Sequence, residues 1–128
     1  MRRTLQLLLA LTVALTMIAA AGVANAANRA SSTVDITRAT GDTEHVQVAG
    51  TVRSDRESCY KNRKVQVWHD VAPDGPSSND FKIGTVRTED NGRWEITTVA
   101  LPDKVYAKVK KNRRCKGDVS STEVVRFK

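Results

Sequence analysis

The side chains best able to do chemistry in this sequence are cationic, and they gather around its two cysteines. Three basic residues follow Cys59 closely and five surround Cys115. These cations are Lys61, Arg63, Lys64, Lys110, Lys111, Arg113, Arg114 and Lys116. A dense group of positive charges attracts polyanions through long-range electrostatics and counterion release. The pattern therefore predicts an anion-binding patch, provided that the two groups meet in the fold.

The cysteines offer a way to bring the two groups together. A lone pair of cysteines, widely separated in the sequence of a secreted protein, indicates a disulfide. The pair has no neighbouring histidines to complete a zinc site, and the sequence has no redox CxxC motif. We therefore expect a Cys59–Cys115 disulfide. It would place all eight cations at one end of the domain, with only Asp118 nearby to offset them.

The expected partner of this patch is an anionic polymer of the cell wall or another extracellular polyanion. Teichoic acids, acidic polysaccharides, anionic lipid head groups and extracellular DNA all carry the required charge. Specific nucleic-acid recognition is not expected, because Tyr60 is the only aromatic residue among the cations and stacking platforms need more. The alternative is that the basic loops only keep the protein soluble and blunt its sheet edges.

Catalytic and metal-binding groups are sparse. His45 and His69 lie at the ends of expected strands, where a histidine is usually solvated. Serines and acids lie near His69, but the polar loop that carries them does not predict the mutual geometry of a triad. Four acids could offer oxygens to Ca²⁺ but lack the spacing of a calcium-binding loop: Asp70, Asp74, Asp80 and Asp90. Asp90 is instead expected to accept backbone N–H bonds in its turn. We expect no catalytic residue, metal or cofactor; a small hydrolase built around His69 is the remote alternative.

Trp68 supports a second hypothesis. Alternation places it on the face opposite Val65 and Val67, where an exposed tryptophan could contact a sugar or a protein. We favour a packed Trp68, covered by the loop at residues 73–80. If it is exposed instead, the protein is an extracellular protein–protein module, an inhibitor or envelope-assembly partner that uses Trp68 and the loop at 70–80.

Short β-strands must position these groups. Apolar and polar residues alternate with period two in most of the runs, which is typical of half-buried strands. The runs are 45–53, 63–69, 81–87, 93–99, 104–110 and 121–127. The residues expected to face the core are Val46, Val48, Gly50, Val52, Val65, Val67, Trp94, Ile96, Thr98, Val105, Ala107, Val109, Val125 and Phe127. Six or seven strands without a helical pattern predict one antiparallel β-sandwich over residues 44–128.

The segments between and before these runs complete the prediction. Asn91-Gly92 is a strong hairpin signal between the runs at 81–87 and 93–99. Residues 27–43 are rich in Ser, Thr, Ala and Asp, and we expect them to be a flexible lead-in to the domain.

The N-terminus has the three zones of a secretion signal. Arg2 and Arg3 precede an apolar stretch, and Ala24-Asn25-Ala26 forms a small-residue site with cleavage before Ala27. The stretch is long enough for a membrane anchor, but it is rich in Ala and Thr towards its end and lacks a stop-transfer cluster. We expect residues 1–26 to be removed. The product would be a secreted or envelope-associated soluble monomer without stable membrane insertion. Its formal charge would be +5, the +7 of the full chain less the two arginines.

One motif connects two of the expected strands. Thr88-Glu89-Asp90-Asn91-Gly92-Arg93-Trp94 is a slightly compressed form of a T-x-D-x-x-G-[aromatic] hairpin. It occurs together with Gly50-Thr51-Val52, Cys59, Val65-Gln66-Val67, Ile83-Gly84-Thr85-Val86-Arg87, Tyr106-Ala107-Lys108-Val109 and Cys115. In these features residues 44–128 resemble secreted bacterial domains of the carboxypeptidase-regulatory-like (transthyretin-like, prealbumin-like) type. The resemblance implies a β-sandwich that serves as an accessory, adhesive or spacer module, and leaves the ligand open.

Overall fold

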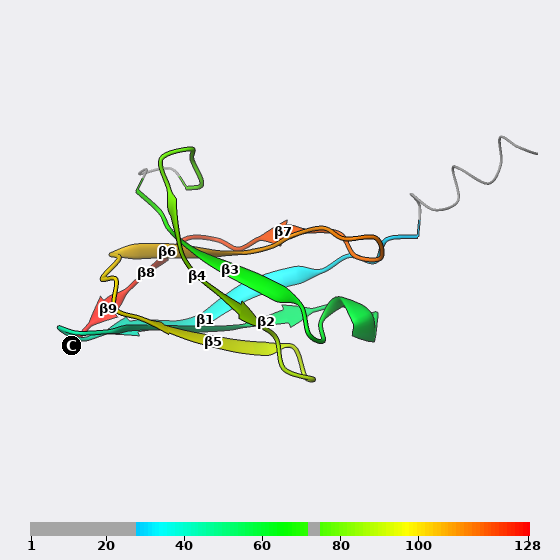
Figure 1. The fold of residues 1–128 in the computed structure, drawn as a ribbon, viewed down its shortest axis with the longest axis horizontal. Coiled ribbons are helices and arrows are strands. Elements are labelled where there is room, and N and C mark those ends of the chain that lie inside the picture. The colour runs from blue at the N-terminus through cyan, green and yellow to red at the C-terminus, as the bar shows by residue number, and fades with distance from the viewer. Residues whose placement is uncertain (1–27, 72–74) are drawn as a thin grey trace, which may run out of the picture.

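The computed structural model of the protein describes residues 28–71 and 75–128, so the expected signal at 1–26 lies outside the described residues. The described chain folds into two β-sheets that face each other (Figure 1), which confirms the all-β sandwich. A short 3-10 turn, η1 (Glu57–Cys59), interrupts the strands. The strands are β1 (Thr33–Gly41), β2 (Val46–Arg53), β3 (Lys64–His69), β4 (Phe81–Arg87), β5 (Arg93–Thr98), β6 (Lys104–Val109), β7 (Asp118–Val119), β8 (Glu123–Val124) and β9 (Arg126–Phe127).

The strand order places chain segments side by side that are distant in sequence. One sheet has the order β5-β2-β1-β9, and the other has the order β4-β3-β6-β7, with β8 also paired to β6. All pairings between these strands are antiparallel except that of β1 with β9. Between the sheets lies a core made mostly of valines. Its members include Val34, Val46, Val48, Val52, Val65, Val67, Val105 and Val109, together with Trp94.

The alternation predicted the buried face of the central strands correctly. Every valine expected to face the core from β2, β3 and β6 is buried, as are Trp94 on β5 and Val125 after β8. Gly50 on β2 leaves room for the Trp94 ring, because a Cβ at Gly50 would lie 2.5 Å from a ring carbon. The large aromatic ring can therefore lie in a core made otherwise of small side chains.

The prediction of a flexible lead-in at 27–43 is wrong for most of that segment. Residues 33–41 form β1, which pairs with β2 along its whole length. A register shift between Ile36 and Arg38 accounts for the missed strand. The shift separates inward-facing Ile36 from inward-facing Ala39 by three positions rather than two, so the period-two pattern is lost.

The predicted hairpin at Asn91-Gly92 is also corrected. The segment does turn, with Gly92 at φ 84° and its N–H donating to the Glu89 carbonyl at 3.0 Å. However, β4 and β5 belong to different sheets, so the turn carries the chain across the sandwich. A turn signal specifies that the chain reverses direction. Whether the two flanking strands then pair with each other or join different sheets depends on which strand edges are already paired.

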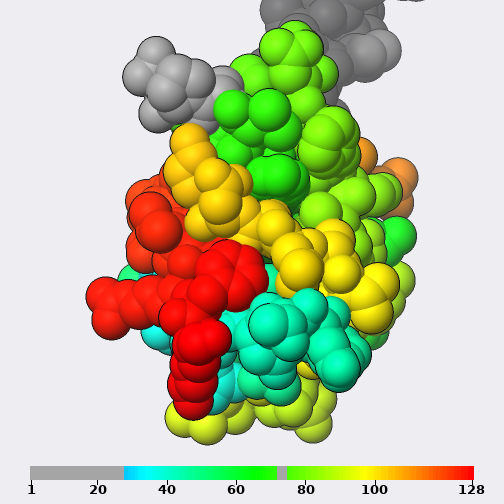
Figure 2. Space-filling view, turned by 90° about the vertical axis from the view of Figure 1, so that its left-hand side faces the viewer, coloured from blue at the N-terminus to red at the C-terminus, as the bar shows by residue number. Residues whose placement is uncertain are grey.

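The two ends of the sandwich differ in composition. Figure 2 looks onto the end formed by residues near 42–46, 99–104 and the C-terminus. Several large apolar side chains of these segments are exposed, including Val99, Leu101 and Val124. Phe127, expected in the core, is 49% exposed, because β9 pairs only with the last two residues of β1. The opposite end carries the disulfide and the cations.

Candidate anion-binding site

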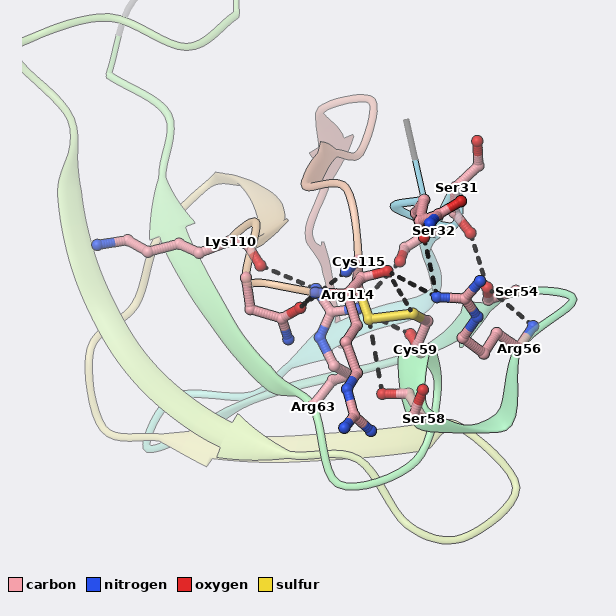
Figure 3. The surroundings of a disulfide bond; sticks show 12 residues. Ser31, Ser32, Ser54, Arg56, Ser58, Cys59, Arg63, Lys110, Arg114 and Cys115 are labelled. Atoms are coloured by element: carbon pink, nitrogen blue, oxygen red, sulfur yellow. Dashed lines mark hydrogen bonds between the residues drawn. A yellow bond between two sulfur atoms is a disulfide. The ribbon is translucent and has the colours of Figure 1, made fainter. Parts of the chain in front are cut away.

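The expected disulfide is present and joins two loops at one end of the sandwich (Figure 3). Cys59 ends η1, Cys115 lies in the connection between β6 and β7, and both side chains are fully buried. Their Cα atoms are 5.5 Å apart. The N-terminal segment joins them, because the Ala30 N–H donates to the Arg114 carbonyl at 2.9 Å and the Ala30 carbonyl accepts from the Lys116 N–H at 2.8 Å. Three distant segments therefore meet at this end.

Arg63 is a structural member of this end rather than an exposed contact, which corrects its place in the expected patch. It is 5% exposed, and its guanidinium reaches all three segments (Figure 3). Nη1 donates to the Cys59 carbonyl at 2.9 Å and to Ser32 Oγ at 3.0 Å, and Nη2 donates to the Lys110 carbonyl at 2.8 Å. Burial lowers the pKa of this guanidinium from its usual value, because a low-polarity surrounding disfavours the charged form.

Lys61 is also less available than expected. Its ammonium lies 3.5 Å from a Glu57 carboxylate oxygen and 3.8 Å from one of Asp90. Asp118, expected to offset the patch, also accepts the Val34 N–H at 2.9 Å and so links β7 to β1. Glu57 and Asp90 are two further acids that partly neutralise this end.

The remaining cations fall into two groups. Lys64, Lys110 and Lys111 line a shallow hollow of about 200 Å³ on the outer side of the sheet that contains β3 and β4. Arg113, Arg114 and Lys116 are exposed in the loop around the disulfide and do not line the hollow. The disulfide thus brings the two sequence clusters to one end, as expected, but only part of them converges on one site.

Sequence reasoning missed Arg87, which completes the hollow. Arg87 ends β4 opposite Lys64 on β3, and its guanidinium donates to the Asn62 carbonyl at 3.2 Å. The remaining lining residues are Asn62, Arg63, Gln66 and Asn112. The hollow therefore combines five cationic side chains with three amides, and no carboxylate is among its described lining residues. Only the pairing of β3 with β4, unknown from the sequence, brings Arg87 here.

The loop that presents Lys110 and Lys111 is held by Asn112. Its side-chain oxygen accepts the Arg114 N–H at 2.9 Å and the Cys115 N–H at 2.8 Å, while its own N–H donates to the Cys115 carbonyl at 3.0 Å. An asparagine that bonds to nearby backbone N–H groups fixes a tight turn. The cationic rim of the hollow is therefore attached to an ordered loop.

Trp68 is packed, but its described ring contact is with Tyr106 rather than with the loop at 73–80 that we expected to cover it. Its ring is stacked on Tyr106 with the planes at 4° and the centroids 6.4 Å apart, and its Nε1 donates to Gln66 Oε1 at 3.3 Å. The Tyr106 hydroxyl in turn donates to Asp80 at 2.9 Å. The ring is thus connected to the described part of the 70–80 loop through Tyr106, and it is only partly exposed.

Asp80 organises this loop. Its carboxylate accepts the N–H groups of Val71 at 2.9 Å and Ser77 at 2.7 Å, in addition to the Tyr106 hydroxyl. Burial alone would raise the pKa of Asp80, but these hydrogen bonds outweigh it and lower the pKa to about 2. Burial and the bond to Asp80 raise the pKa of Tyr106 to about 12. The carboxylate is a structural acceptor whose oxygens are occupied.

Of the four acids considered as calcium ligands, the three that the structure describes do not form one cluster. Asp70 is buried and accepts from Thr122 Oγ1 at 2.7 Å, Asp90 is exposed in the turn, and Asp74 lies outside the described residues. The described residues contain no cluster of three His, Cys, Asp or Glu side chains that could hold a metal ion. In the turn, Asn91 rather than Asp90 accepts a backbone bond, from the Arg93 N–H at 3.0 Å.

The two histidines are likewise separate. His45 lies 3.9 Å from Glu44, and His69 Nε2 lies 3.0 Å from Asp103 Oδ1. That hydrogen bond lowers the pKa of the Asp103 carboxyl. His69 thus has an orienting carboxylate that the sequence did not suggest. Within residues 28–71 and 75–128, no serine, threonine or tyrosine hydroxyl is hydrogen-bonded to His69.

Comparison with known proteins adds no further constraint. No family model matches the chain, and a search of the curated proteins found no match. Within the described residues, no helix is long and apolar enough to cross a membrane. The site therefore has to be interpreted from its own geometry.

Proposed function

We propose that this protein is a secreted, non-catalytic β-sandwich that binds an anionic cell-surface or extracellular polymer through the hollow beside its disulfide. The observation that carries the proposal is the lining of the hollow. Lys64, Arg87, Lys110 and Lys111 surround it, and no carboxylate is among its described lining residues. A concave site with one sign of charge concentrates counter-ions more strongly than the same charges spread over a convex surface.

Secretion is part of the proposal and rests on two features. Residues 1–26 have the order of charge, apolar run and small residues that signal peptidases recognise. The Cys59–Cys115 disulfide is the kind of bond that persists in an oxidising compartment. Membership of the carboxypeptidase-regulatory-like sandwich domains likewise stays a proposal, supported by the motif at 88–94.

The experiment is retention of the mature protein on heparin and on a teichoic-acid column, eluted with a salt gradient. We expect late elution and a steep dependence on salt. The test variant is Lys64→Gln/Lys110→Gln/Lys111→Gln, which removes three charges from the hollow. Each phosphate that the variant no longer neutralises should reduce the slope of log affinity against log salt by roughly 0.7 to 0.9, which gives a total of about 2 to 3.

The matched control is Arg113→Gln/Arg114→Gln/Lys116→Gln, which removes the same charge from the same end but outside the hollow. We expect it to keep most of the retention. Elution of the native protein at low salt would remove the proposal. Equal losses of retention in the two triple variants would show that the charge acts diffusely and that the hollow has no special role.

A further inference from the structure

The buried Arg63 charge has no acidic partner among the described residues. Its three hydrogen bonds go to two carbonyls and one hydroxyl, and no described carboxylate lies within ion-pair distance of its guanidinium. Charged side chains are rarely this buried unless they are paired. The three bonds also occupy only three of the five N–H donors of the guanidinium. Arg63 therefore carries charge and hydrogen-bonding capacity that the described part of the chain does not use.

The hollow opens beside this charge. Arg63 is one of its lining residues, together with Lys64 and Arg87 from adjacent strands and Lys110 and Lys111 from the loop after β6. Like charges that line the same hollow repel one another. An anion in the hollow would replace this repulsion with attraction to several cations at once.

The donors surround the hollow from several directions. Arg63 and Lys64 come from the β3 side and Arg87 from β4, while Lys110, Lys111 and the Asn112 amide come from the opposite loop. Guanidinium groups match the oxygens of phosphate and sulfate in forked pairs, and ammonium and amide groups add further donors. Lining residues from three segments let donors approach an anion from several sides, which suits a tetrahedral oxyanion better than a planar carboxylate.

We propose that the hollow is a discrete subsite for one tetrahedral oxyanion, a phosphate or sulfate group, with Arg63 among the residues that line it. The inference rests on the proposed function and specifies the group of the polymer that is recognised. A phosphodiester of a wall polymer and a sulfate of a polysaccharide share this chemistry. Because Arg63 also bonds to the segments at Cys59, Lys110 and Ser32, the bound anion stabilises the fold of this end.

The test uses the mature, disulfide-bonded protein and small anions. Inorganic phosphate and sulfate are titrated at constant ionic strength, with chloride as the balancing ion and acetate as the carboxylate probe. Binding is followed by the shifts of backbone amide resonances and by Tm. We expect saturable shifts confined to residues 62–66, 85–88 and 110–113, with a rise in Tm that saturates over the same concentrations, because the general stabilisation by these anions does not saturate. Acetate should bind at least about tenfold more weakly, equivalent to 1.4 kcal/mol.

The same two triple variants separate this inference from the proposed function. Lys64→Gln/Lys110→Gln/Lys111→Gln should weaken phosphate and sulfate binding about tenfold or more, and Arg113→Gln/Arg114→Gln/Lys116→Gln should leave it nearly unchanged. Titrations with a glycerol-phosphate polymer and with heparin then distinguish a phosphodiester from a sulfate as the source of the oxyanion. Shifts that do not saturate, or that acetate reproduces, would overturn the subsite. The polymer-binding proposal would still stand if column retention depended on the hollow.

Discussion

Removing the disulfide should destabilise the domain strongly while leaving its fold intact. The perturbation is the double variant Cys59→Ala/Cys115→Ala. The bond closes a loop with a sequence separation of 56 residues. Loop-closure entropy for that length gives a loss of about 4 kcal/mol in the free energy of unfolding. A domain of this size has a total of about 5–15 kcal/mol, so the variant should still fold.

The fold should persist because other bonds hold the same loops. Arg63 connects the Cys59 and Lys110 carbonyls, and Asn112 fixes the turn before Cys115. Most of the effect then lies in the unfolded chain, which expands when it loses the cross-link. A more expanded unfolded state exposes more surface, so the denaturant m-value should rise as the free energy of unfolding falls.

The assay is urea unfolding followed by the fluorescence of the two tryptophans, the partly exposed Trp68 and the buried Trp94. We expect a single cooperative transition, a larger m-value and a Tm lower by on the order of 20 °C. Native protein kept in reductant is the control, and it should match the double variant. A loss below about 1 kcal/mol with an unchanged m-value would refute the entropic reasoning. A non-cooperative transition would show instead that Arg63 and Asn112 cannot hold this end alone.

Three further predictions concern the loop and the crossing turn. Asp80→Asn should destabilise the protein near neutral pH. The Asp80 pKa of about 2 lies below its ordinary 3.8, so its contribution is present above about pH 4 and is lost as the pH falls towards 2; acid titrations of unfolding for both proteins test this. Tyr106, with a pKa of about 12, should contribute fully below pH 10 and lose its contribution as the pH rises to 12. The phenolate absorbance of a Tyr60→Phe variant isolates this ionisation, and a titration midpoint near 10 would contradict it. Gly92→Ala should cost roughly 2 kcal/mol or more, measured by urea unfolding, because φ is 84° and the Cβ would lie 2.3 Å from the Val52 carbonyl oxygen; a neutral effect would mean that the turn relaxes.

The sequence predicts the fold where one local pattern decides it. In β2, β3 and β6 apolar residues recur at every second position, so the buried valines follow from period two alone, although Gln66 on β3 and Tyr106 on β6 are buried as well. In β1 a single register shift is enough to hide a nine-residue strand. The crossing turn at 88–92 shows the same limit in another form, because Asn91-Gly92 specifies φ at the turn and nothing about which sheet the next strand joins.

The candidate site depends on features that the sequence predicts and also on strand order and burial, which it does not predict. The cysteine pair determines how far along the sandwich the cations lie, and that position follows from the sequence once the disulfide is assumed. Which cations share a surface depends on strand order: Arg87 joins Lys64 only because β4 pairs with β3. Whether a cation is accessible to a ligand depends on its burial. Arg63 is buried, and its guanidinium is hydrogen-bonded to three neutral oxygens from separate segments.

The burial of Arg63 changes how the basic end should be interpreted. The three hydrogen bonds of Arg63 give it a structural role, but they leave a buried positive charge without a carboxylate, which is unfavourable. An anion in the hollow that Arg63 helps to line would add attraction to a charge that has no acidic partner among the described residues. The effect of such an anion can be measured. Sulfate and phosphate stabilise folded proteins generally, because they are excluded from the surface. A built site adds a gain that saturates with anion concentration and that Lys64→Gln/Lys110→Gln/Lys111→Gln loses while Arg113→Gln/Arg114→Gln/Lys116→Gln keeps it.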